Sequence, residues 1–449
     1  MATTYITRTT GTSTNVDKCT FSGWIKRSYG TSTADEVFMG EYTDASNRGK
    51  LIFAGDMLHY FQKTGGSTTA DVKTTRVFRD QGAWYHIVVA FDSTQVTDTD
   101  RIKFYINGVQ ETLFTNTSYP SSGQNIRINE SSAPIFIGQA GASASYFSGE
   151  MSHVQFVDGL QLAPTEFGEV DSTSGIWKIK TTAYATPGTN GFFLKMEDRT
   201  NLDLDSSSNA HTFTTTGTLT ATYDNPSNNF ATWNPLMPNH TPANNATYSN
   251  GNTSSITTAT GGLGGMSSQG SDVSKWYAEI KMTSESTGGA SAVGVYKNPG
   301  LGLGANSPHD SNKFYGVRSN GTKLTATVGS GSWGASYSAG DILSLALDID
   351  NDRLYIAKNG LWSDGSGSYD EAAPDAYVTL SADDTWFFGC GDCEGGGTAA
   401  HDVNFGNGYF GTTAVTSAEA DDAGIGAFEY APPTGYYALC TKNIKAYGG

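Results

Sequence analysis

Charged residues, cysteines and long apolar runs are all scarce in this chain of 449 residues. Asp, Glu, Lys and Arg make up 16% of it, against about 25% in an average soluble domain. Because no run of about 18 apolar residues occurs, we expect no membrane-spanning helix and no insertion into a membrane. The first residues contain neither a basic segment nor an apolar one, so we expect no secretory signal and synthesis in a cytoplasm.

The four cysteines, Cys19, Cys390, Cys393 and Cys440, are too few and too scattered for a disulfide framework. Cys390 and Cys393 form a lone Cys-x-x-Cys pair. Zinc would need two further ligands, and only Cys440 and His401 lie nearby in the sequence. We therefore expect two reduced thiols or a local disulfide at this pair.

Acidic residues outnumber basic ones, 44 to 27, which gives a formal net charge of −17. A field of this sign repels a phosphate backbone, so we expect no nucleic-acid partner. It favours solubility but does not identify a ligand.

Motifs of the common catalytic sites are also missing. The sequence has no Gly-x-Ser-x-Gly elbow, no His-Glu-x-x-His helix and no phosphate-binding loop. A retaining glucanase of the jelly-roll type needs carboxylates that alternate along one strand. The closest approach, Glu169-Val170-Asp171, lacks the third carboxylate. We therefore predict a solvated loop at that place, a protein that is not an enzyme, and no cofactor.

What the chain does contain is typical of β-structure: 54 Gly, 23 Tyr, 22 Phe and 8 Trp, with abundant Thr and Ser. In the N-terminal half, alternating or β-branched runs predict strands, and Asn107-Gly108 is typical of a two-residue hairpin turn. The predicted strands are residues 20–28, 84–92, 101–109, 133–138 and 149–157, followed by a short helical turn at 162–168.

The C-terminal half repeats this pattern. An apolar strand, an acidic turn and an amphipathic strand that ends in Asn-Gly occur once in each half. Two distant copies cannot stack as a solenoid, so they indicate two sandwiches of related architecture. The predicted strands here are residues 275–280, 314–317, 340–348 and 353–357.

The segment between the halves, residues 223–262, is dense in Asn, Thr, Pro and Ser and is predicted to be a linker. Its apolar residues Phe230, Trp233 and Met237 indicate that part of it docks on a domain. This gives an N-terminal domain at 1–222 and a C-terminal domain at 263–449.

Several motifs occur in the order found in known families. The N-terminal segments FSGWIKRS, WYHIVVAFD and RIKFYINGVQ resemble the LamG-like (concanavalin A-like) jelly-roll domains of tailed phages that infect marine bacteria. The C-terminal segments KWYAEIKM, FYGV and GDILSLALDIDNDRLYIAKNGLW resemble a SPRY domain. The resemblance implies an all-β chain of two antiparallel β-sandwiches, a LamG-like jelly roll and then a SPRY-like sandwich.

Both families bind sugars or proteins through rim loops. The resemblance therefore implies a non-enzymatic virion surface protein of a tailed phage, made in the host cytoplasm. It would act as a tail fibre or receptor-binding protein that attaches to host-surface glycans or protein. The alternatives are a capsid decoration or tail-assembly protein and a polysaccharide depolymerase. The expected partners are other virion proteins and further copies of the chain.

Four aromatic residues in Gly/Ser-rich loops are the candidate ligand-binding residues: Trp333, Tyr337, Trp362 and Tyr369. Exposed rings there would stack on sugars, whereas in the alternative each ring folds back onto its own sheet.

Asp348, Asp350 and Asp352 are a candidate Ca²⁺ site, because hard cations prefer clustered oxygen atoms. The sequence lacks the Gly and the terminal Glu of an EF-hand, so the alternative is a polar turn between two strands.

Overall fold

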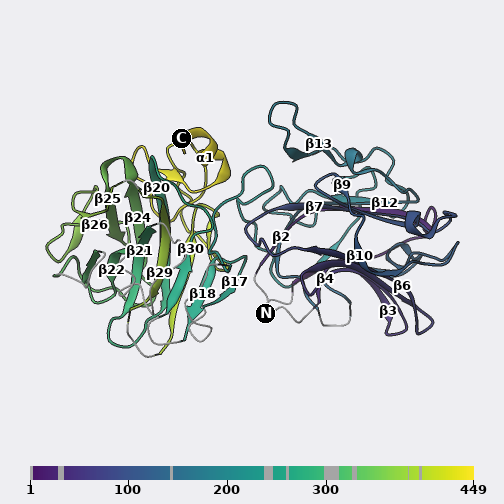
Figure 1. The fold of residues 1–449 in the computed structure, drawn as a ribbon, viewed down its shortest axis with the longest axis horizontal. Helices are drawn as coiled ribbons and strands as arrows, with labels where there is room; N and C mark the ends of the chain where they lie inside the picture. Colours follow the sequence, from purple (N-terminus) through teal and green to yellow (C-terminus); the bar gives the residue numbers. More distant parts are fainter. Residues whose placement is uncertain are drawn as a thin grey trace. The chain divides into compact units, whose positions relative to one another are not determined.

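The computed structural model describes residues 4–28, 35–141, 145–236, 246–258, 262–297, 313–325, 331–382, 384–393 and 397–448. The chain divides into two compact units, residues 1–221 (unit 1) and 222–449 (unit 2). Both are built almost entirely from antiparallel strands, as the composition predicts (Figure 1). No helix in the described ranges has the length and apolar character needed to span a membrane.

Unit 1 is a sandwich of two sheets. The first has eight strands in the order β10-β6-β5-β4-β3-β11-β1-β16, and the second has six in the order β15-β12-β2-β7-β8-β9. The large sheet contains β1 (Tyr5–Thr9), β3 (Glu36–Asp44), β4 (Asn47–Ala54), β5 (Met57–Thr64), β6 (Ser67–Val77), β10 (Phe114–Ser118), β11 (Pro134–Ile137) and β16 (Thr214–Thr216). The smaller sheet contains β2 (Lys18–Arg27), β7 (Tyr85–Asp92), β8 (Ile102–Ile106), β9 (Val109–Gln110), β12 (Gly149–Asp158) and β15 (Phe192–Leu194).

Alternating side chains of unit 1 fill the space between its sheets. Phe21 and Ile25 of β2 are fully buried there, with Val89 of β7 and Leu51 of β4. The intervening residues point to the outer faces, as the period of two requires. A separate hairpin, β13 (Gly168–Val170) and β14 (Trp177–Ile179), follows the short helix η3 (Pro164–Glu166). Figure 1 labels it above β9 and the smaller sheet.

Unit 2 is also a sandwich, with a ten-stranded and a five-stranded sheet. The larger sheet has the order β17-β18-β30-β20-β24-β25-β26-β27, with β28 paired to β25 and β33 to β20; the smaller has the order β19-β29-β21-β22-β23. The larger contains β17 (Thr247–Ser249), β18 (Ser254–Thr257), β20 (Lys275–Ser284), β24 (Ile342–Asp348), β25 (Arg353–Lys358), β26 (Leu361–Ser363), β27 (Tyr369–Glu371), β28 (Tyr377–Thr379), β30 (Ala399–Asn404) and β33 (Tyr437–Ala438). The smaller contains β19 (Leu263–Met266), β21 (Ser291–Lys297), β22 (Phe314–Arg318), β23 (Lys323–Thr325) and β29 (Trp386–Asp392).

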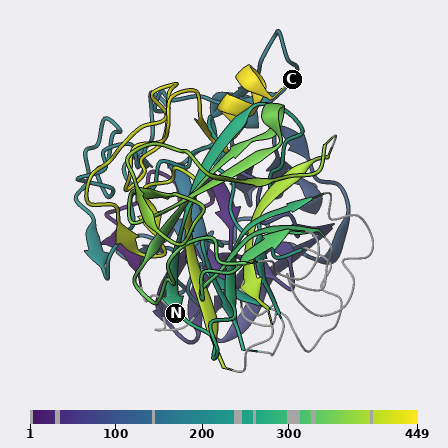
Figure 2. The same cartoon turned by 90° about the vertical axis from the view of Figure 1, so that its left-hand side faces the viewer.

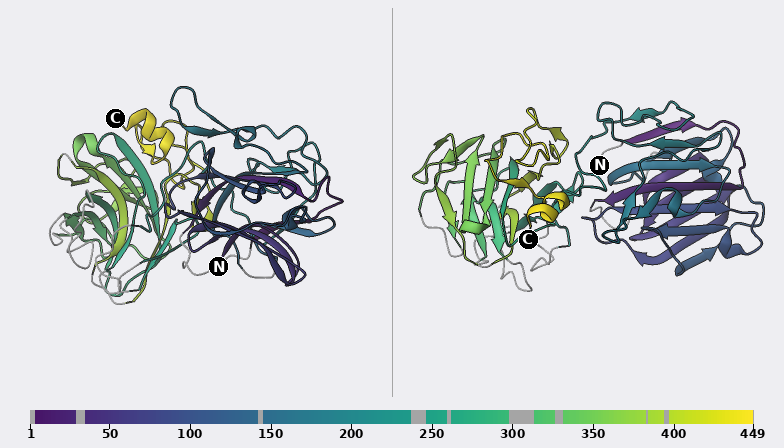
Figure 3. Two further views of the ribbon diagram at one scale, coloured as in Figure 1. Left: turned by 45° about the vertical axis from the view of Figure 1, so that its right-hand side comes forward. Right: turned by 90° about the horizontal axis from the view of Figure 1, so that it is seen from above.

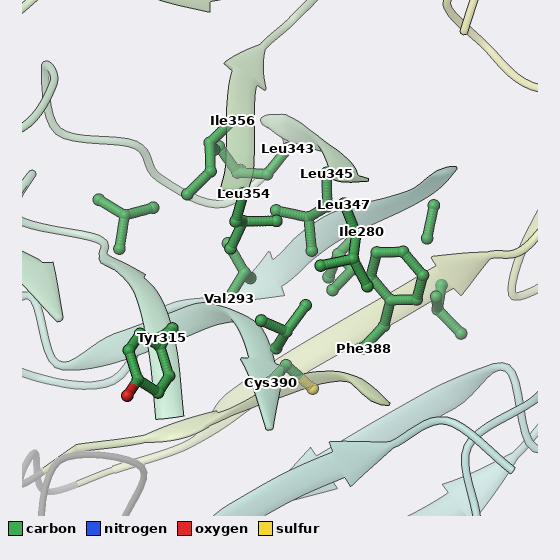
Figure 4. Packing of buried hydrophobic residues seen from close by; sticks show 14 of the residues in the cluster. Ile280, Val293, Tyr315, Leu343, Leu345, Leu347, Leu354, Ile356, Phe388 and Cys390 are labelled. Atoms are coloured by element: carbon green, nitrogen blue, oxygen red, sulfur yellow. The ribbon is translucent and has the colours of Figure 1, made fainter. Parts of the chain in front are cut away.

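The core of unit 2 is made where the two sheets face each other. Leu343, Leu345 and Leu347 of β24 point between the sheets, and Phe388 and Cys390 of β29 lie opposite them (Figure 4). The outer face of β20 and β24 is covered by side chains from residues 405–448, which we call the C-terminal strap; among them are Phe428, Tyr436 and Cys440. The strap contains β31 (Tyr409–Phe410), β32 (Thr413–Ala414) and the helix α1 (Thr441–Tyr447), and is yellow in Figures 1 and 2.

The described residues of the expected linker belong to unit 2, where Phe230 and Trp233, two of the residues expected to dock on a domain, are buried. Strand β18 pairs with β30 over four residues, and Trp233 is fully buried with its ring 5.6 Å from that of Phe405. Met237 lies outside the described residues. Ser- and Thr-rich sequence suits an edge strand as well as a linker, so composition alone could not separate the two.

Both predicted Asn-Gly hairpins are confirmed and have the same geometry. Asn107 and Gly108 have φ of 48° and 81°, and Asn359 and Gly360 have φ of 51° and 87°, as a type I′ turn requires. In each case the Asn side-chain oxygen accepts a backbone N–H from the strand next to the hairpin, that of His86 in β7 at 2.8 Å in unit 1 and that of Ile342 in β24 at 2.9 Å in unit 2. The right-hand view of Figure 3 shows the strands of unit 1 from above.

Candidate functional site

The four loop aromatics proposed as ligand contacts are buried instead. The exposed fractions of Trp333, Tyr337, Trp362 and Tyr369 are 4%, 2%, 6% and 8%. Trp333, Tyr337 and Tyr369 are brought together in the core between the sheets, whereas Trp362 lies on the outer face of the larger sheet, under the strap.

The Gly-rich composition of these loops explains the error. A Cβ on Gly334 would lie 2.4 Å from the Tyr369 ring, so the ring lies directly against the backbone there. Small residues thus let aromatic rings fold back onto their own sheet. These rings stabilise unit 2 and offer no exposed stacking surface.

The candidate metal site is a polar turn. Both carboxylate oxygens of Asp348 accept hydrogen bonds from the Asn351 side chain, and Lys275 lies 2.9 Å from one of them. Asp350 accepts the backbone N–H of Ser274 at 2.8 Å. Asp352 has φ of 55° and closes the turn. Nowhere in the described part of the chain do three or more His, Cys, Asp or Glu side chains form a group that could hold a metal.

Cys390 and Cys393 are buried thiols that form no disulfide. Cys390 points into the core between the sheets and Cys393 packs in a different cluster, beside Tyr296 and Phe314. Burial raises the pKa of the Cys390 thiol to about 12, so it carries no nucleophilic thiolate at neutral pH.

One Ser–His pair has the distance of a catalytic dyad, but the histidine nitrogen that faces the serine already carries a hydrogen. The Ser22 hydroxyl lies 2.9 Å from Nε2 of His86, and Nε1–H of Trp177 donates to Nδ1 of His86 at 2.9 Å. Because an indole N–H can only donate, Nδ1 carries the lone pair and Nε2 carries the hydrogen. Burial lowers the pKa of His86 to about 3. His86 therefore donates to Ser22 and cannot remove its proton.

The carboxylates nearest to a glycosidase pattern are also bound elsewhere. Lys178 lies 3.2 Å from Glu169 and 3.4 Å from Asp171, on the hairpin formed by β13 and β14. Hydrogen bonds from Ser174 and Thr173 lower the pKa of Asp171 to about 2. Asp171 is therefore ionised at neutral pH and cannot act as a general acid.

On the outer face of the smaller sheet, Glu150 and Asp92 stand opposite Lys26 and Lys18, at the two ends of β2. Eight residues of strand separate them by about 26 Å. The carboxylates of a retaining or inverting glycosidase are only about 5 to 9.5 Å apart, so this pair has neither spacing.

The carboxylate with the most unusual environment is Glu279, which is fully buried under the strap. It accepts the backbone N–H groups of Glu429 (2.9 Å) and Tyr430 (2.8 Å), Nδ2 of Asn404 (3.2 Å) and the hydroxyl of Tyr277 (3.2 Å). Burial raises the pKa of Glu279 to about 8. Since its partners are main chain and neutral side chains, Glu279 anchors the strap to the sheet.

A different surface, on the large sheet of unit 1, has the composition of a ligand-binding face. The central residue is Phe61 of β5, which stands directly across from Lys50 of β4 and Asp71 of β6. Leu51, Tyr60 and Val72, one residue away on each strand, are fully buried in the core. The side chains around Phe61 therefore point outward, and they are partly exposed.

Polar groups surround the Phe61 ring. Nζ of Lys50 lies 5.6 Å from the ring centroid, and Lys50 also pairs with Asp35. Oδ1 of Asp71 accepts Nε2–H of His59 at 2.8 Å and Nδ2 of Asn116 at 2.7 Å. We call the set that shares this outer surface the Phe61 face: Asp35, Arg48, Lys50, His59, Phe61, Lys63, Asp71, Lys73 and Asn116.

This combination matches what sugar recognition needs. A partly exposed ring can stack on the apolar face of a pyranose, and the carboxylates, amide and ammonium groups beside it can exchange hydrogen bonds with ring hydroxyls. Burial lowers the pKa of His59, so its neutral imidazole donates to Asp71 and orients that carboxylate.

Comparison with family models finds a match within unit 1. Residues 1–166 match the concanavalin A-like lectin/glucanases superfamily. Unit 1 thus contains a concanavalin A-like lectin/glucanase domain. No curated protein sequence matches the chain.

Several solved structures show partial similarity. The human HERC1 SPRY domain is 18% identical, with TM-score 0.26, over 33% of this chain and 86% of that one. The pentraxin of Limulus polyphemus is 18% identical, with TM-score 0.27, over 35% and 71%. Tailspike protein 2 of an Escherichia coli O157:H7 bacteriophage is 12% identical, with TM-score 0.26, over 35% and 21%.

The Phe61 face was missed in the sequence because no strand was predicted between residues 36 and 77. The available signal was the alternation of His59, Phe61 and Lys63 with the buried Tyr60 and Gln62. A polar residue at an inward position and a register shift after Gln62 obscure that alternation.

Proposed function

We propose that the chain is a carbohydrate-binding attachment protein and that the Phe61 face of unit 1 contacts the glycan. The observation that supports this most is the partly exposed Phe61 ring between the Lys50–Asp35 pair and Asp71, on a domain of the lectin/glucanase superfamily. A rigid sheet holds these groups in place, so little ordering would be needed on binding.

The same proposal places the protein on the surface of a tailed-phage virion, as a tail fibre or receptor-binding protein without enzymatic activity. Several copies on one particle would convert weak binding into firm attachment. This part rests on the motif resemblance of both halves, and immunogold electron microscopy of particles with an antibody against the chain tests it. Gold at the tail is the expected result, and unlabelled particles would contradict it.

A glycan array tests the binding activity. We expect the full chain to bind a subset of glycans and the Phe61→Ala variant to lose most of that signal. A matched control is Phe387→Ala, which removes a partly buried ring from unit 2. Equal loss in both variants would contradict the assignment. New reducing ends after long incubation with a bound polysaccharide would instead indicate a depolymerase.

One observation favours the alternative of a virion assembly protein. The hairpin of β13 and β14 exposes Val170 and Ile176 by 60% and 66%. Exposed apolar side chains at a hairpin are suited to protein contact. If Val170→Ser with Ile176→Ser prevents incorporation into particles while glycan binding persists, this hairpin attaches the protein to other virion proteins.

A further inference from the structure

The charge of the Phe61 face differs in sign from that of the chain. The chain has a net charge of −17, whereas the face contains four basic residues, Arg48, Lys50, Lys63 and Lys73, and two acidic ones. A local patch of this kind determines which charged ligand can approach it. At about 0.1 M salt the Debye length is about 10 Å, so the effect of acidic groups farther away than this is screened.

The two acidic residues of the face already have partners. Asp35 pairs with Lys50, and Asp71 accepts hydrogen bonds from His59 and Asn116. Neither takes up the remaining cations.

Three cations are left over: Arg48 donates to the backbone carbonyl of Ala45 at 2.8 Å, and Lys63 and Lys73 are the two others. Neither lysine has an ion-pair partner among the residues that the structure describes. Lys73 lies close enough to His59 to lower the pKa of that imidazole, after the larger effect of burial. Two unpaired ammonium groups on a half-exposed sheet face are available to an anionic ligand.

The two lysines flank the aromatic ring. Lys63 follows Phe61 by two residues on β5. Lys73 of β6 stands across from His59, which precedes Phe61 by two residues, so the two lysines lie on opposite sides of the ring along the strand direction. At about 3.4 Å per residue, the cations are about 14 Å apart along the sheet with the ring between them. A short stretch of polysaccharide laid over Phe61 would reach both.

We propose that the Phe61 face binds an acidic glycan: one sugar ring stacks on Phe61 while anionic groups on the neighbouring sugars pair with Lys63 and Lys73. This inference rests on the proposed carbohydrate-binding function and specifies its ligand class. Asp71 and Asn116 would exchange hydrogen bonds with hydroxyls of the stacked sugar, so a polyanion without pyranose rings, such as single-stranded DNA, would lack these contacts.

Affinity electrophoresis or calorimetry at about 0.1 M salt tests the proposal with the full chain and four probes: polygalacturonate, dextran sulfate, neutral dextran and single-stranded DNA. The variants are Lys63→Ala with Lys73→Ala, and Phe61→Ala. The control is Lys442→Ala with Lys445→Ala, which removes the same charge from α1 of unit 2.

We expect polygalacturonate or dextran sulfate to bind at least about tenfold more tightly than dextran and DNA. Tighter binding of polygalacturonate would identify the preferred anionic group as a carboxylate, and tighter binding of dextran sulfate would identify it as a sulfate. The Lys63/Lys73 variant should lose about tenfold in affinity and the Phe61 variant a similar factor, while the Lys442/Lys445 control changes by less than about twofold. Unchanged melting temperatures would show that the variants fold.

Three results would overturn the proposal. Binding of dextran alone would leave the proposed carbohydrate-binding function standing and remove the acidic ligand. DNA binding as tight as that of the acidic glycans would show a general polyanion surface. Binding of no glycan at all would contradict the proposed function itself.

Discussion

The two units share one structural feature, an Asn-Gly turn covered by an aromatic ring, but different segments supply that ring. Each has an Asn-Gly hairpin, and in each a later segment returns to lay an aromatic ring on the turn glycine. A Cβ on Gly108 would lie 2.5 Å from the Trp177 ring, and one on Gly360 would lie 2.7 Å from the Tyr430 ring. The segment that returns in unit 1 is a small hairpin, whereas in unit 2 it is the whole strap. Related sandwiches can therefore differ in which faces they leave open.

The units also differ in how they hold a buried carboxylate. Glu41 in unit 1 is bound by both Nε and Nη2 of Arg127, at 3.0 and 2.7 Å. Glu279 in unit 2 is bound by neutral donors only, and the pKa of Glu279 is raised to about 8. Burial raises the pKa of both carboxyl groups; the Arg127 ion pair opposes this rise in Glu41, whereas only backbone N–H groups and neutral side chains oppose it in Glu279.

The largest expected effect is in unit 1. Arg127→Ala leaves the Glu41 carboxylate buried and uncompensated, so we expect unit 1 to lose about 3 to 5 kcal/mol of unfolding free energy. Urea unfolding measures it. Arg79→Ala, which removes a largely exposed cation, should cost less than about 0.5 kcal/mol. A loss below about 1 kcal/mol for Arg127→Ala would show that the pair is not what holds Glu41.

The next effect is in unit 2 and depends on pH. A glutamate with a pKa near 4.5 when unfolded and about 8 when folded contributes stability that is fully present below pH 4.5. That contribution is lost as the pH rises from 4.5 to 8. Glu279→Gln should remove this slope and cost about 1 to 3 kcal/mol at pH 5, because its amide group would face a backbone N–H.

Unfolding of both proteins at several pH values tests this prediction, with Glu371→Gln on exposed β27 as the matched control. If the wild-type slope between pH 4.5 and 8 persists in Glu279→Gln, another group is responsible.

The two Asn-Gly hairpins should respond alike. Asn107→Ala and Asn359→Ala each place alanine at a positive φ and remove the hydrogen bond to the neighbouring strand, β7 or β24. Asn359→Ala also removes the hydrogen bond from its Nδ2 to Asp341. We expect each to cost about 1 to 2 kcal/mol in its own unit. Thermal unfolding of the single variants and the double variant measures the two losses. Additive losses fit two separate units, and a strong coupling between them would not.

The smallest effect concerns the His86 imidazole in unit 1. Trp177→Phe keeps a ring over Gly108 but removes the N–H that binds His86, so we expect a loss of about 1 kcal/mol. Histidine NMR gives a second readout. His86 should remain neutral with its hydrogen on Nε2 down to about pH 3. Titration near pH 6.5 would contradict the burial of His86, and a hydrogen on Nδ1 would contradict the assigned tautomer.

Much of the fold follows from local sequence. The predicted runs at 20–28, 84–92 and 149–157 are β2, β7 and β12, and those at 340–348 and 353–357 are β24 and β25. Their alternation and their Asn-Gly turns are local properties, and local properties can be read from one chain.

The sites could not be predicted in the same way. Whether Tyr369 is exposed depends on Gly334, which lets the ring approach the backbone, and no pattern in the loop predicts this contact. The Phe61 face depends on register, because Phe61 meets Asp71 only through the pairing of β5 with β6. A shift of one residue would bury Phe61 and expose Tyr60.

Hydrogen–deuterium exchange of the full chain with and without polygalacturonate or dextran tests the central claim, that unit 1 binds glycans through the Phe61 face. The account predicts slower exchange in β4, β5 and β6, residues 47–77, and no such change in the Phe61→Ala variant. Protection confined to residues 331–371 of unit 2, around the aromatic residues of its loops, would contradict it.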